Sequence, residues 1–149
     1  MREVSATAGI DAPPQAVFDF LADLENLPSW QTGIVSARMT TSGPVGRGSR
    51  AHVVRELMGQ RLEVDLALTD HQPGRRLELE SAASGIGVVA TLELEPDGDA
   101  TRLRFTMRIK AQTLFMAPVE GMVAGAAERD IADSVARVKR HFADASAPG

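Results

Sequence analysis

Arg55 is the residue whose type and position most directly suggest binding chemistry. It lies two residues after Val53 and two before Leu57, so a strand here would turn all three side chains to one face. We expect no strand carboxylate on that face, and an unpaired buried guanidinium is costly. Three interpretations stay open: Arg55 meets Glu120 or Glu128 of a later helix, it reaches solvent near the strand end, or it contacts an anionic ligand group.

Other reactive side chains are few and dispersed. His52, His71 and His141 fall in a predicted strand, a turn and the last turn of a helix, which predicts no metal site. His52 faces Asp65 in the predicted pairing, but on the charged outer face of the sheet, where a surface pair is expected. Glycines at 43–48 precede a strand, which favours a turn over a phosphate-binding loop. The chain has no cysteine, so thiolate chemistry is excluded, and we expect no cofactor.

The charge balance excludes some classes of partner. The chain has 149 residues, with 16 Lys and Arg against 20 Asp and Glu, a formal charge of -4 that predicts no binding to nucleic acid. The start lacks an apolar signal core, and no stretch approaches the roughly 18 apolar residues of a membrane span. We therefore expect a cytoplasmic protein with no integral membrane segment.

The hydrophobic pattern predicts one α+β domain. A strand at 4–10 precedes two short helices that end near Trp30, and apolar residues spaced by three or four predict a long helix over 116–142. Alternating patterns predict six strands between them, at 35–39, 51–57, 62–69, 77–83, 86–94 and 103–111. Short connections containing glycine predict antiparallel hairpins. We expect a single domain over 1–143 and a flexible tail over 144–149.

The hairpins also predict which residues lie opposite one another. Two-residue loops would pair Leu57 with Gln60, Gln72 with Arg75, Ala83 with Ile86, and Pro96 with Asp99. One face then collects apolar side chains: Ala51, Val53, Leu62, Val64, Leu66, Leu68, Leu77, Leu79, Val88, Ala90, Leu92, Leu103, Phe105 and Met107. The other face pairs unlike charges: Glu56 with Arg61, His52 with Asp65, Arg76 with Glu93, and Glu93 with Arg102.

The long helix is the expected cover for the apolar face. Residues 121–127 of this helix are small, whereas Ile131, Val135, Val138 and Phe142 are bulkier, so its two halves cannot fill space equally. Either a hollow lies beside the small half, or the small residues let helix and sheet approach closely. The sequence pattern leaves both alternatives open.

The element order resembles that of the START-like helix-grip superfamily (SRPBCC). Local sequence at 10–14, 27–30, 46–50, 73–77 and 95–103 is similar to its polyketide cyclase/dehydrase and lipid-transport branch. The resemblance implies a helix-grip fold, in which a seven-stranded antiparallel sheet wraps around a long C-terminal helix and encloses a cavity. Members of the superfamily use that cavity for lipids, hormones, polyketides or other apolar molecules.

The resemblance and the predicted inner face together give a candidate ligand-binding site. Arg55 and Ser81 are its polar groups, and Trp30 either caps the cavity mouth or anchors the core. The predicted ligand-binding residues are Trp30, Val53, Arg55, Leu66, Leu79, Ser81, Ala90, Phe105, Met107, Met122, Val123 and Ala126.

Two functions follow from this site. The first is binding of a small hydrophobic molecule, lipid-like, polyketide-like or aromatic, with an acidic group on the ligand as one option. The alternative is a polyketide cyclase, aromatase or dehydratase that uses no metal or nucleotide cofactor, with Arg55 stabilising an enolate. The chain has no Tyr and we expect no His inside, so Glu120 or Glu128 would have to move protons. Both a monomer and a homodimer fit the sequence.

Overall fold

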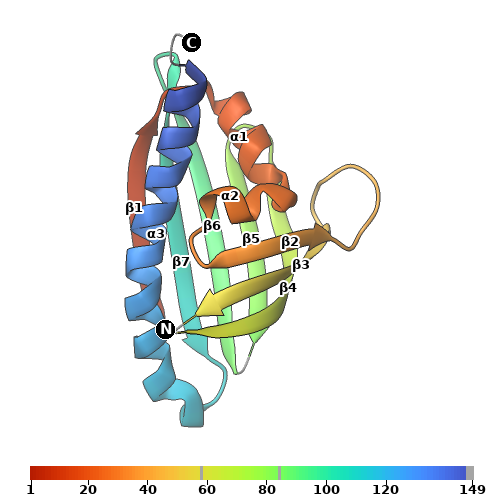
Figure 1. The fold of residues 1–149 in the computed structure, drawn as a ribbon, viewed down its shortest axis with the longest axis vertical. Helices are drawn as coiled ribbons and strands as arrows, with labels where there is room; N and C mark the ends of the chain where they lie inside the picture. The colour runs from red at the N-terminus through yellow and green to blue at the C-terminus, as the bar shows by residue number, and fades with distance from the viewer. Residues whose placement is uncertain (58, 84, 147–149) are drawn as a thin grey trace.

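A curved antiparallel sheet wraps around a long helix in the computed structural model (Figure 1). The structure describes residues 1–57, 59–83 and 85–146. In chain order the elements are β1 (Arg2–Ile10), α1 (Pro14–Ala22), η1 (Leu24–Asn26), α2 (Leu27–Trp30), β2 (Ile34–Met39), β3 (Arg50–Leu57), β4 (Gln60–Gln72), β5 (Arg76–Ala83), β6 (Ile86–Asp97), β7 (Ala100–Ala111), η2 (Leu114–Met116) and α3 (Ala117–Ser146). The seven strands follow the order β1-β7-β6-β5-β4-β3-β2, so the predicted helix-grip fold is confirmed.

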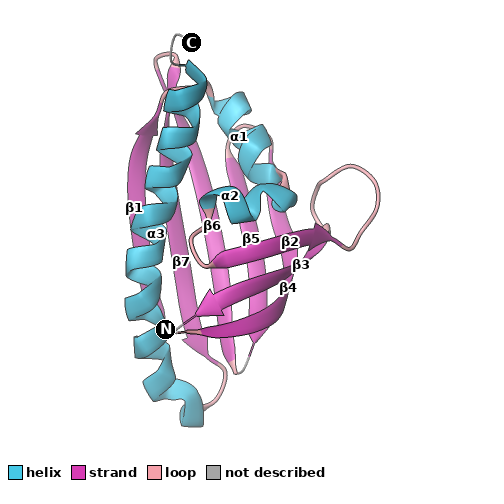
Figure 2. Ribbon diagram, in the orientation of Figure 1, coloured by secondary structure: helices cyan, strands magenta, loops and turns pink. Residues whose placement is uncertain are grey.

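The predicted inner face of the sheet is also correct. Every apolar residue assigned to it is buried or half-buried. The expected pairings of Leu57 with Gln60 and of Ala83 with Ile86 are confirmed. Figure 2 shows the three α-helices on the same side of the sheet, which the apolar face requires.

The β6–β7 hairpin is shifted from its expected register. Pro96 pairs with Thr101 rather than Asp99, and Glu93 therefore lies opposite Arg104 rather than Arg102. The two-residue loop consists of residues 98 and 99, with glycine at φ +61 in its first position, where a tight hairpin needs a positive φ. Moving the loop by one residue shifts each pairing by two, so every side chain keeps its predicted face.

The expected pairing of Gln72 with Arg75 is wrong because of a bulge. Gln72 lies opposite Arg76, not Arg75, because β4 has an irregularity between Leu68 and Asp70. The predicted register of β4 and β5 is therefore correct up to Leu68, which lies opposite Leu79, and wrong by one residue beyond the bulge. A bulge of this kind adds one residue to one strand and bends it.

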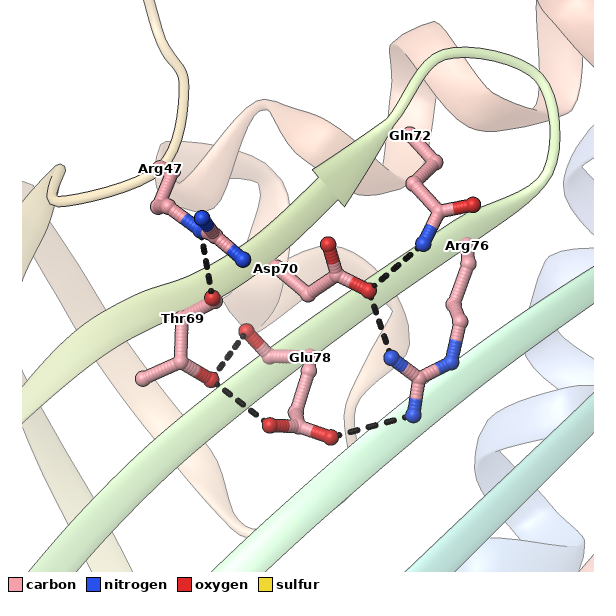
Figure 3. Close-up of polar contacts among 6 residues, drawn as sticks. All are labelled: Arg47, Thr69, Asp70, Gln72, Arg76 and Glu78. Atoms are coloured by element: carbon pink, nitrogen blue, oxygen red, sulfur yellow. Dashed lines mark hydrogen bonds and ion pairs between the residues drawn. The ribbon is translucent and has the colours of Figure 1, made fainter.

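Arg76 holds the bulge in place through two carboxylates (Figure 3). Its Nη1 donates to Asp70 Oδ2 at 2.5 Å, and its Nη2 donates to Glu78 Oε2 at 3.1 Å. The hydroxyl of Thr69, at the bulge itself, donates to Glu78 Oε1 at 3.0 Å. Arg76 lies opposite Glu93 in the backbone register, as expected, but its guanidinium binds these nearer carboxylates.

The core is densest where α1, α2 and the second half of α3 meet the sheet. Trp30 is fully buried, and its ring packs edge to face against Phe105 at 5.7 Å. Ile131 and Val138 of α3 are buried on the same side. The 30-residue helix α3 runs through Ser146, so it includes the first three residues of the expected tail, and residues 147–149 lie outside the described chain.

No described helix has both the length and the apolar character needed to cross a membrane.

We expect Arg76→Gln to lower the midpoint of thermal unfolding at pH 7. In the native protein the hydrogen bond from Arg76 keeps the pKa of Asp70 below the usual 3.8. A carboxyl group whose pKa is lower in the folded state stabilises the fold at pH values above its unfolded pKa. This contribution is lost as the pH falls through the folded-state pKa. The difference between wild type and variant should therefore shrink below about pH 4.

Circular dichroism melts at pH 7 and pH 3 measure this difference. Arg104→Gln, at an exposed position of β7, is the matched control. An equal deficit of Arg76→Gln at both pH values would mean that its ion pair with Asp70 does not support the bulge.

Candidate ligand-binding site

A cavity of about 240 Å³ lies between the first half of α3 and the inner face of the sheet. Of the two alternatives that the sequence leaves open, a hollow beside this half of the helix is the one that the structure shows. Its walls come from β3 and β4 (Arg55, Gln60, Leu62 and Val64), from β5, β6 and β7 (Ser81, Ile86, Val88, Met107 and Ile109), and from η2 and α3 (Met116, Val119, Val123, Ala127 and Asp130).

A second, smaller hollow of about 20 Å³ adjoins the first. It shares Arg55, Ser81 and Met107 with the main cavity, and Gln31 and Ile34 close it on the side of α2 and β2. Arg55 thus lies where the two spaces meet.

The structure brings together eight of the predicted site residues. Val53, Arg55, Leu66, Leu79, Ser81, Ala90, Met107 and Val123 line one or both hollows. Strand parity explains this agreement, because one correct register places alternate residues of several strands on the same wall.

The other four predicted residues lie away from the cavity walls. Trp30 and Phe105 pack against each other in the core, which settles the Trp30 alternative in favour of an anchor. Met122 is 61% exposed and Ala126 does not line the cavity, because both point away from the stripe formed by Val123 and its helical neighbours.

Sequence reasoning missed the most polar part of the α3 wall. Val119, Val123 and Ala127 recur every four residues along one face, and Asp130 follows three residues after Ala127 on that face. A carboxylate within an apolar helical stripe was a visible signal. Met116 was missed because it belongs to the separate turn η2.

Arg55 lines the cavity from β3. Its Nε is buried and has no hydrogen-bond partner among the residues that the structure describes. Burial lowers the pKa of the guanidinium, and the negative charge of Asp130 partly opposes this effect. Within the described chain no carboxylate lies at ion-pair distance from Arg55.

The two expected partners of Arg55 are engaged or oriented elsewhere. Glu120 binds the Met1 ammonium at 2.9 Å and accepts a hydrogen bond from the Ala111 amide at 2.9 Å. Glu128 is exposed. The carboxylate that faces Arg55 is instead that of Asp130, whose pKa is raised by burial and lowered less strongly by Arg55.

Gly33 marks the point on which both charged groups converge. Its φ of +99 is a conformation that favours glycine. A Cβ at this position would lie 3.5 Å from Asp130 Oδ2 and 3.8 Å from Arg55 Nε. Both distances are ordinary van der Waals contacts, so it is the positive φ that favours glycine in this loop between α2 and β2.

The remaining chemistry of the site is limited. No group of His, Asp and Glu that could hold a metal occurs among the described residues. His52 lies on the outer face and contacts Asp65 at 3.0 Å and Glu63 at 3.2 Å, so the expected surface pairing is confirmed. The cavity thus combines apolar walls with one cation, one carboxylate and the polar groups of Gln60 and Ser81.

Because Arg55 is buried without an ion pair among the described residues, we expect it to lower the free energy of unfolding. We expect Arg55→Leu to unfold at the same or a higher urea concentration, with a gain of up to about 2 kcal/mol, because leucine avoids burying a charge. Asp130→Asn should lower stability, because it removes a negative charge that offsets the buried cation.

Urea unfolding followed by circular dichroism measures both effects. Arg61→Leu on β4, where the side chain is 70% exposed, is the control and should change stability by less than about 0.5 kcal/mol. A marked loss of stability in Arg55→Leu would identify Arg55 as a structural residue.

The sequence and the fold were both compared with those of known proteins. The sequence matches the model of the family "Polyketide cyclase / dehydrase and lipid transport" over residues 1–143. No curated protein sequence matches the chain.

Solved structures share the fold at low sequence identity. A START superfamily protein from Mycobacterium smegmatis is 16% identical, with a TM-score of 0.77 over 97% of this chain and 99% of that chain. Ara h 8.0201 is 14% identical, with a TM-score of 0.74 over 96% of this chain and 98% of that chain. The di-domain ARO/CYC BexL, from the BE-7585A biosynthetic pathway, is 17% identical, with a TM-score of 0.69 over 97% of this chain and 47% of that chain.

These likenesses establish the fold, and the family match extends over nearly the whole sequence. The chain belongs to the polyketide cyclase/dehydrase and lipid-transport family.

Proposed function

We propose that the protein binds a small, mostly apolar molecule whose single neutral polar group, a hydroxyl, is held between Arg55 and Asp130. The observation that carries this proposal is the buried Arg55 Nε, which has no hydrogen-bond partner among the described residues and borders an apolar cavity. An unsatisfied buried donor is costly unless something else satisfies it. A ligand oxygen is the partner that this site lacks.

Cavity size limits the ligand class. Sites for drug-sized ligands measure about 300–1,000 Å³. The cavity of about 240 Å³ is smaller and equals the volume of roughly eight water molecules. This size favours a molecule with one or two rings, or a short chain, over a long-chain lipid or a four-ring polyketide.

The charges of Arg55 and Asp130 favour a hydroxyl on the ligand over the acidic ligand group that the sequence also suggested. A carboxylate on the ligand would gain from Arg55 but would be repelled by Asp130. A hydroxyl satisfies both residues, because its oxygen accepts from Arg55 while its proton is donated to the Asp130 carboxylate. A purely apolar ligand would leave the Arg55 donor unsatisfied.

Three probes with the same two-ring body test the polar part of the proposal: naphthalene, 1-naphthol and 1-naphthoate. By isothermal titration calorimetry we expect 1-naphthol to bind about tenfold or more tightly than naphthalene, as one hydrogen bond to a charged group provides. Lowering the pH toward the raised pKa of Asp130 should strengthen 1-naphthoate binding, because protonation removes the repulsion.

Variants assign the effects to individual residues. Arg55→Leu should abolish the preference for 1-naphthol while naphthalene still binds, and Val123→Phe should block all three probes by filling the cavity. Arg102→Leu, at an exposed position on β7, is the control for loss of an arginine. Equal affinities of wild type and Arg55→Leu for 1-naphthol would refute the proposal.

Asp130 also favours a second candidate function, enolisation of a ketone ligand as in a cyclase or dehydratase. The sequence suggested no acid–base group inside except on the helix, and Asp130 fills that role with a pKa raised by burial. In this reaction Asp130 takes a proton from the carbon next to the carbonyl, and Arg55 donates a hydrogen bond to the enolate oxygen.

Deuterium exchange at that carbon distinguishes turnover from binding. Proton NMR can follow this exchange in 1-tetralone dissolved in D₂O. The catalytic alternative predicts that wild type speeds the exchange above its rate in buffer alone and that Asp130→Asn does not. Exchange at the buffer rate with wild type, under conditions where 1-tetralone binds, would leave binding as the function.

A further inference from the structure

The turn before α3 exposes apolar side chains. Leu114 is 94% exposed, Phe115 88% and Met122 61%, and we call these three residues the apolar tip. Among the described residues, only Met1 and Val35 are other large hydrophobic residues with comparable exposure. Exposed apolar side chains that are clustered, rather than scattered, indicate an interaction surface.

The apolar tip is continuous with the cavity wall. Met116 and Val119, from the same turn and helix start, line the cavity. Met116 packs directly over Gly85 of the β5–β6 hairpin, where a Cβ would lie only 2.9 Å from its Cγ. In Figure 1 the first turns of α3 extend beyond the ends of the neighbouring strands, and Leu114 and Phe115 directly precede this helix start.

Two basic side chains lie beside the start of α3. A Cβ at Gly121 would lie 3.5 Å from Nη2 of Arg2, and the exposed Lys110 precedes Ala111, whose amide donates to Glu120 of α3. Glu120 is buried, binds the Met1 ammonium at 2.9 Å and lies 4.0 Å from Nε of Arg2.

We propose that the apolar tip docks on an anionic lipid bilayer, with Leu114 and Phe115 inserted among the headgroups and with Arg2 and Lys110 against the lipid phosphates. Apolar side chains beside cations are the combination that binds such an interface. Docking in this orientation turns the Met116 end of the cavity toward the membrane, from which an apolar ligand can enter. This surface is separate from Arg55 and Asp130.

A second copy of the chain fits the tip less well than a membrane does. Three side chains bury far less than the roughly 1,200 Å² of a stable protein interface. Symmetric contact between two tips would also bring Arg2 and Lys110 of both copies close together, and like charges repel. An anionic surface gains from the same cations.

Vesicle co-sedimentation tests the docking. Wild type should bind vesicles of phosphatidylcholine with about one third phosphatidylglycerol, and high salt should weaken the binding. The double variant Leu114→Ser/Phe115→Ser should bind about tenfold less or not at all. Val35→Ser, which removes an exposed apolar side chain on β2, is the control and should bind like wild type. Emission of the buried Trp30 verifies that each variant is folded.

A second measurement follows the tip itself. Phe115→Trp should show a blue shift in its emission when phosphatidylglycerol vesicles are added, whereas the fully buried Trp30 does not respond. The proposal is overturned if wild type fails to bind the vesicles or if the double variant binds them equally. It is also overturned if light scattering shows a wild-type dimer that the double variant lacks, because the tip then binds a second copy. None of these outcomes depends on ligand binding by Arg55.

Discussion

Three helices cover the apolar face of the sheet, and the first half of the longest, α3, does not fill the space beneath it. Ile131 and Val138 pack the second half of α3 into a dense core with the short helices. Over the first half, Val123 and Ala127 leave a cavity of about 240 Å³. Close packing is the normal state of a protein interior, so a hollow of this size is the feature on which the proposed ligand binding rests.

The charges within that hollow give it chemical character. Arg55 lies on a mostly apolar wall, and the negative charge of Asp130 on α3 partly offsets the effect of burial on its guanidinium. Gly33, whose φ is positive, lies beside both groups. A fold that needed only stability would place an apolar residue at 55, so the cost of this arginine is best explained by function.

Sequence patterns predicted the fold well because alternation and helical spacing constrain whole elements. The β6–β7 loop was misplaced by one residue, yet Phe105 and Met107 kept their face, since a hairpin shift of two preserves parity. The bulge beside Asp70 was not predictable, because strand alternation gives no signal for an irregularity within β4. Asp130 was missed for a different reason: which helix carboxylate faces Arg55 depends on the position of the helix over the sheet, which periodicity does not determine.

Native mass spectrometry of protein purified without detergent tests the central claim most directly, because it requires no choice of ligand. The account predicts that wild type retains a small molecule with a hydroxyl group on an apolar body, and that Arg55→Leu, folded to the same extent, retains much less of it. An empty wild type that also binds none of the two-ring probes would contradict the account and indicate a cavity without a ligand.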